Sequence, residues 1–140
     1  MDDASLLRAF EDATLPHASW RHREHVKVGY LHLCRDPFDL ALPRMRAGIR
    51  RLNAAHGVVD TPKRGYHETM THAWLRLVDA AKRADGPFDN ADAFVAAHAE
   101  LMQPTLLRLF YTRDRLWSPE ARIRFVEPDL DPLKAAPTRE

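Results

Sequence analysis

Apolar residues recur every three or four positions along most of the chain, which is the spacing of amphipathic helices. Helices are predicted over about residues 3–15, 19–34, 37–56, 66–84 and 90–102, with shorter ones after positions 104 and 118. Nowhere does the sequence alternate between apolar and polar residues as a half-buried strand does. The pattern therefore predicts an all-α fold: a compact helical bundle of four main helices plus short C-terminal helices.

The C-terminal segment differs from the rest of the chain. After Glu127 the helical periodicity stops, and Pro128 and Pro132 follow within a few residues. Proline lacks the amide hydrogen that a helix interior needs. With 140 residues in all, the sequence predicts a single helical domain over 1–140, in which 126–140 form an extended tail.

Composition narrows the classes of function. The 21 basic and 20 acidic side chains leave a formal net charge of +1, which argues against a nucleic-acid surface or a polybasic membrane anchor. The single cysteine excludes an internal disulfide and a Cys-cluster zinc site. No segment approaches the ~18 apolar residues of a membrane span. We expect a cytoplasmic protein that binds a small molecule and has no nucleic-acid or membrane partner. The oligomeric state is not predicted, and a homodimer is one possibility.

Some of the eight histidines fall where the helical pattern expects apolar residues. At about 100° per residue, His22 points in the same direction as Gly29 and Leu33, and His25 lies about 60° away on the same side. In the helix over 66–84, His67 aligns with the apolar stripe and Glu68 lies at its edge. Both helices are thus expected to aim histidine at a shared interior.

Helical bundles build metal sites in this way, from side chains on facing helices. His22, His25, His67 and Glu68 would supply three nitrogens and one oxygen, a set that suits zinc, iron, manganese or nickel. The segment from His22 to His25 does not match a zinc-protease helix, because its histidines are three residues apart rather than four. The leading prediction is a divalent transition metal in a small metal-dependent enzyme, with Glu68 as a ligand or a catalytic proton carrier.

A second hypothesis uses the same side chains without a metal. In it the protein is a non-catalytic binding module whose polar, histidine-lined pocket takes a small acidic ligand or a partner segment. Tyr66, Thr69 and Arg122 are further candidates for contact with a ligand or cofactor. The arginines between positions 44 and 51 are more typical of a solvated helix face than of DNA binding. A third hypothesis is that the histidines are scattered and have only structural roles.

Three segments carry a resemblance to other proteins. They are residues 19–25, with a His-x-x-His spacing, residues 65–71, which read Gly-Tyr-His-Glu-Thr-Met-Thr, and the Glu-Pro-Asp-Leu run at 127–130. Together they resemble a group of short, uncharacterised bacterial all-helical proteins. The resemblance implies an all-helical fold and assigns no activity.

Overall fold

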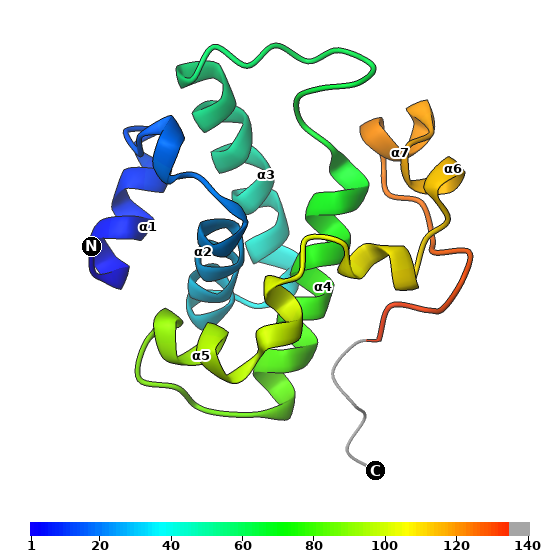
Figure 1. The fold of residues 1–140 in the computed structure, drawn as a ribbon. Coiled ribbons are helices and arrows are strands. Elements are labelled where there is room, and N and C mark those ends of the chain that lie inside the picture. Colours follow the sequence, from blue (N-terminus) through cyan, green and yellow to red (C-terminus); the bar gives the residue numbers. More distant parts are fainter. Residues whose placement is uncertain (135–140) are drawn as a thin grey trace.

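The computed structural model describes residues 1–134, and its regular structure there is entirely helical (Figure 1). The α-helices are α1 (Asp3–Glu11), α2 (His22–Arg35), α3 (Phe38–Ala55), α4 (Glu68–Ala84), α5 (Ala91–Ala97), α6 (Arg113–Leu116) and α7 (Pro119–Ile123). Short 3-10 turns occupy His17–Ser19, Ala99–Met102 and Leu106–Leu109. The predicted all-α fold is confirmed.

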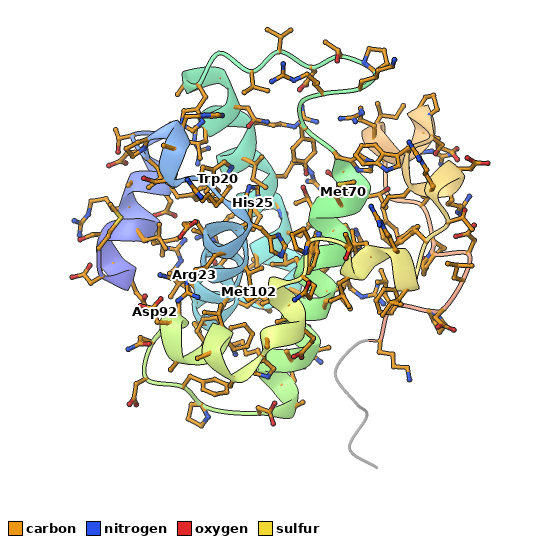
Figure 2. All side chains as sticks on the ribbon, in the orientation of Figure 1. Trp20, Arg23, His25, Met70, Asp92 and Met102 are labelled. Atoms are coloured by element: carbon orange, nitrogen blue, oxygen red, sulfur yellow. The ribbon has the colours of Figure 1, made fainter. Side chains whose placement is uncertain are left out.

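Helix α2 lies at the centre of the larger part of the molecule, in contact with α1, α3, α4 and α5. Helices α6 and α7 pack on the side of α4 that faces away from α2 (Figure 1). Two ion pairs join α2 to α5, because Arg23 and Lys27 of α2 each lie 2.9 Å from Asp92 Oδ1. Figure 2 labels Arg23 and Asp92 on neighbouring helices. Among residues 1–134 no helix combines the length and the apolar content that a membrane crossing requires.

Two helices begin later than their periodicity predicts, and both shifts affect the predicted site. Helix α2 starts at His22, because Arg21 is extended and its amide donates to Glu24 Oε1 at 3.3 Å. Helix α4 starts at Glu68, because His67 is its N-cap and Nδ1 of its ring accepts from the Met70 amide at 3.1 Å. An N-cap residue has non-helical backbone angles. His67 therefore leaves the apolar stripe to which the helical wheel assigned it.

The buried apolar residues form two clusters, one on each side of α4. The larger is built from α1 to α5, and the smaller packs Ala73 of α4 against Tyr111, Leu116, Val126 and Leu133. Residues 126–134 contain no helix, and they lie against the bundle through buried apolar side chains. The predicted tail, 126–140, includes these residues. Its remaining positions, 135–140, lie outside the described residues.

Gly48 sets how closely α1 approaches α3. Phe10 is fully buried, and a Cβ built on Gly48 would lie 2.3 Å from Phe10 Cε2. We expect Gly48→Ala to lower the free energy of unfolding by about 1–2 kcal/mol, since a clash this close to a fully buried ring should cost about 2–3 kcal/mol, the upper part of the usual overpacking range, and alanine returns about 1 kcal/mol in helix propensity. Urea denaturation of wild type and variant measures this change in the free energy of unfolding. Ala47→Ser, at the exposed neighbouring position, is the control and should change stability by no more than about 0.5 kcal/mol.

Candidate functional site

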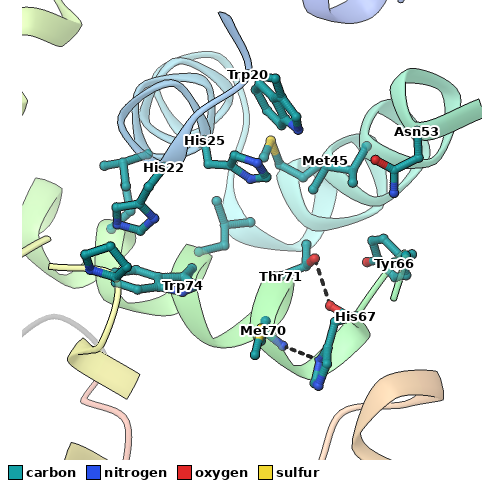
Figure 3. Close-up of a pocket in the computed structure, with 17 residues that line it drawn as sticks. Trp20, His22, His25, Met45, Asn53, Tyr66, His67, Met70, Thr71 and Trp74 are labelled. Carbon is teal, nitrogen blue, oxygen red and sulfur yellow. Dashed lines mark hydrogen bonds between the residues drawn. The ribbon is translucent and has the colours of Figure 1, made fainter. Parts of the chain in front are cut away.

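A cavity of about 460 Å³ lies between α2, α3 and α4 (Figure 3). This volume falls within the range of about 300–1,000 Å³ that is typical of small-molecule sites. We call it the main cavity. Its walls consist of Trp20, His22, His25, Val26, Gly29, Met45, Ile49, Asn53, Gly65, Tyr66, His67, Met70, Thr71, Trp74, Leu75, Val78 and Pro104.

Most of these walls are apolar or aromatic. The helices α2 and α4 meet closely at one point, where a Cβ on Gly29 would be 3.3 Å from Leu75 Cδ1. The aliphatic residues Val26, Ile49 and Val78 are buried in the same core. An apolar body that enters the cavity would therefore leave water for a hydrophobic surface.

Two aromatic pairs bring imidazoles to the cavity. The ring of His25 stacks on Trp20 with their centroids 3.8 Å apart, and His22 meets Trp74 edge-on at 4.6 Å. Trp20 lies just outside α2, in the short connection that follows the 3-10 turn at 17–19. The same connection that shortens α2 thus places an indole against His25.

His25 is the predicted site residue whose polar atoms stay free. In the described part of the chain neither ring nitrogen has a hydrogen-bond partner, while the ring lines the main cavity. Burial, with a smaller contribution from neighbouring His22, lowers the pKa of His25 from its ordinary 6.5 to about 3. The ring is neutral at pH 7 and presents one donor and one acceptor.

His22 is partly engaged elsewhere. Its Nε2 lies 2.7 Å from the carbonyl oxygen of Leu101. Because a carbonyl only accepts, that nitrogen carries the proton, and Nδ1 is the acceptor that remains. The contact ties the first turn of α2 to the 3-10 turn at 99–102.

His67 uses both of its ring nitrogens for structure. Nδ1 accepts from the Met70 amide, and Nε2 donates to the carbonyl oxygen of Leu116 at 2.8 Å. Its ring points from the start of α4 away from His25 (Figure 3). Burial lowers the pKa of His67, so the neutral form that these bonds require is favoured. His67 lines the edge of the main cavity, but it joins α4 to α6 rather than facing His22.

Glu68 is held in a buried ion pair. Its carboxylate accepts from Arg46 Nε at 2.8 Å and Nη2 at 2.7 Å, and the Tyr66 hydroxyl donates to Oε1 at 2.7 Å. Burial alone raises the pKa of a carboxyl group, but here the bonds from Arg46 and Tyr66 outweigh it, and the pKa of Glu68 is lowered. Glu68 does not line the main cavity. Its contacts are those of a structural anchor.

The four predicted metal ligands do not form one cluster. Residues 1–134 contain no group of three or more His, Cys, Asp or Glu side chains that could hold a metal ion. The physical reason lies in the partners of each group: His67 and Glu68 are saturated by other parts of the protein, and His22 is turned to Leu101. The geometry gives the metal hypothesis no support.

The other three candidates have separate positions. Tyr66 lines the main cavity with its hydroxyl turned to Glu68. Thr69 is fully buried, and its hydroxyl donates to the Arg124 carbonyl at 2.9 Å and accepts from the Val126 amide at 3.1 Å. It anchors the C-terminal segment and does not line the main cavity. Arg122 lies outside the main cavity, beside Gly65 and Tyr66.

Several residues of the site were not predicted from the sequence. The arginines of α3 are not a simple solvated face, because Arg46 pairs with Glu68 and Arg50 lies over the Tyr66 ring at 4.5 Å. Asn53 also lines the main cavity. It lies four residues after Ile49 on the apolar stripe of α3, and this spacing is the signal that could have identified it.

The comparisons with known proteins add no family. No family model, no curated protein and no solved structure matches the chain.

Proposed function

We propose that this protein binds a small molecule with an apolar body in the main cavity and does not transform it. The support is a cavity of about 460 Å³ with largely apolar walls and the imidazole of His25, whose two ring nitrogens have no hydrogen-bond partner among residues 1–134. A binding site of this type fixes its ligand by apolar contact and orients it through a few polar groups.

The observation that carries the proposal is the free imidazole of His25. The half-buried ring lines the main cavity and its nitrogens have no hydrogen-bond partner among residues 1–134, so a ligand can bond to them without breaking a bond within the protein. Because neutral His25 offers one donor and one acceptor, it matches a hydroxyl or another group that both donates and accepts. Its stacking on Trp20 holds the ring in position.

The side chains around the cavity favour binding over catalysis. A general acid or base works best when its pKa lies near the operating pH, whereas the pKa of His25 is about 3. His67 is saturated by backbone groups, and Glu68 by Arg46 and Tyr66. Glu68, the predicted proton carrier, therefore has both carboxylate oxygens bonded to other groups of the protein.

A titration with 2-naphthol tests the proposal. This probe has an aromatic body with one hydroxyl and is neutral at pH 7. We expect NMR shifts of the indole resonances of Trp20 and Trp74, which line the main cavity. Met70→Trp, which fills the cavity, should abolish these shifts. Met102→Trp, at a half-buried methionine outside the cavity, should leave them unchanged. Equal binding by both variants would contradict the proposal.

The hydrogen bond to His25 has its own test. His25→Phe keeps an aromatic ring against Trp20 and removes both polar atoms. We expect 2-naphthol to bind roughly 3- to 10-fold more weakly to this variant, which corresponds to the loss of one hydrogen bond. Naphthalene, which has no hydroxyl, should bind the two proteins equally. The same loss for naphthalene would show that His25 acts through shape alone.

A further inference from the structure

A second cavity of about 260 Å³ adjoins the main cavity. The two share Asn53, Gly65, His67 and Met70 as lining residues. The second cavity is completed by Val58, Lys63, Arg64, Trp117 and Arg122. We call it the basic cavity, because three of its side chains carry a positive charge.

The loop before α4 places Lys63 and Arg64. Thr61 and Arg64 bond to each other through their backbones, at 2.9 and 3.3 Å. The Thr61 hydroxyl also accepts from the amides of Lys63 and Arg64 at 3.2 and 3.0 Å. Gly65 follows with a φ of +97°, a conformation that favours glycine. The turn thus holds both cations at the edge of the basic cavity.

Arg122 is oriented by the backbone rather than by a carboxylate. Its Nη1 donates to the carbonyl oxygens of Gly65 and Tyr66 at 3.4 and 3.3 Å, and its guanidinium lies 5.8 Å from the centre of the Trp117 ring. No ion pair of Arg122 occurs among residues 1–134. The Nε and Nη2 donors are left for another acceptor.

The nearby acidic groups are already engaged. Asp60 accepts from the Tyr66 amide at 2.9 Å and is not a lining residue. Glu68 is paired with Arg46, and Glu120 with Arg124. Asp60 keeps its charge and has no ion pair among residues 1–134, so three cations face one nearby unpaired carboxylate and a net positive charge remains at the basic cavity.

We propose that the basic cavity receives the carboxylate of the ligand whose apolar body occupies the main cavity. This inference rests on the proposed binding function and adds the chemical class: an organic acid with an aromatic or aliphatic body. A planar guanidinium with two free donors fits a carboxylate in a bidentate manner, and Lys63 and Arg64 add long-range attraction for an anion.

Three naphthalene probes with one shared body test the inference: 2-naphthol, 2-naphthoate and 2-naphthyl phosphate. We expect 2-naphthoate to bind about tenfold or more tightly than 2-naphthol, as charge-assisted hydrogen bonds imply. This advantage, the ratio of the affinity for 2-naphthoate to that for 2-naphthol, should decrease between 50 and 500 mM NaCl because salt screens exposed charges. The indole resonance of Trp117, which lines only the basic cavity, should shift with 2-naphthoate and not with 2-naphthol.

Arg122→Gln should remove the advantage of 2-naphthoate while changing 2-naphthol binding less than about twofold. Lys63→Gln and Arg64→Gln, at exposed positions, should each reduce the advantage partly. Arg51→Gln, an exposed arginine that lines neither cavity, is the matched control and should leave it unchanged.

The outcomes separate the two proposals. Binding of 2-naphthol without an advantage for 2-naphthoate would overturn the carboxylate site and leave the binding function standing. Tighter binding of 2-naphthyl phosphate than of 2-naphthoate would replace the carboxylate by a phosphate. If none of the three probes shifts Trp20 or Trp74, the binding function itself fails. An equal loss in Arg51→Gln would show that only net charge matters and would also overturn the site.

Discussion

Replacing Arg46 by methionine is expected to lower the free energy of unfolding by about 2–4 kcal/mol. The change leaves the Glu68 carboxylate, with a side chain 10% exposed, without its cation. Breaking a fully buried pair costs about 3–5 kcal/mol. We expect somewhat less here, because the Arg46 side chain is 36% exposed and the Tyr66 hydroxyl still bonds to Glu68. Chemical denaturation of the variant measures the loss.

Two further variants show whether the loss comes from the buried pair. The double variant Arg46→Met with Glu68→Gln should be more stable than Arg46→Met alone, because it no longer buries an unpaired charge. Arg83→Met breaks the pair with Asp79 on α4, where the arginine side chain is 58% exposed, and should cost no more than about 1 kcal/mol. A double variant no better than the single one would mean that Glu68 is not an anchored carboxylate.

Acid is expected to destabilise the protein through His25. Its pKa is about 3 in the folded chain and about 6.5 when unfolded, so the unfolded state binds more protons between these values. The contribution of neutral His25 to stability is thus fully present above pH 6.5 and is lost as the pH falls toward 3. Between pH 7 and pH 5 we expect it to account for a loss of about 2 kcal/mol.

Denaturation of wild type and His25→Phe at both pH values isolates this contribution. The variant should lose about 2 kcal/mol less than wild type over the interval. The window ends above the pH at which most carboxyl groups titrate, but burial also lowers the pKa of His32, His67 and His72. Some acid sensitivity will therefore remain. His17→Phe, at an exposed histidine, is the control and should lose as much stability as wild type over the interval. A loss about 2 kcal/mol smaller in this variant as well would refute the assignment to His25.

The fold class was predictable because it depends on periodicity. The apolar spacing along the chain identified the main helices. Helix starts were less predictable, because they depend on capping bonds that involve unexpected residue types. His67 as an N-cap is the clearest case, since two residues of shift at the start of α4 changed the direction of its ring.

The candidate site was predictable in part. The wheel placed His22 and His25 toward the interior, and both line the main cavity. It could not show which partners already satisfy a polar group. The partners of Glu68 and His67, which are Arg46 and the Leu116 carbonyl, lie 22 and 49 residues away in the chain. Such long-range pairs depend on tertiary packing, and no local sequence pattern predicts them.

The most direct measurement of the central claim is a crystal structure of the protein with 2-naphthol. The rings of the probe should occupy the main cavity in contact with Trp20 and Trp74, and its oxygen should lie within about 3.2 Å of a ring nitrogen of His25. A probe bound on the surface, or an empty cavity in a crystal of protein that binds 2-naphthol in solution, would contradict the claim.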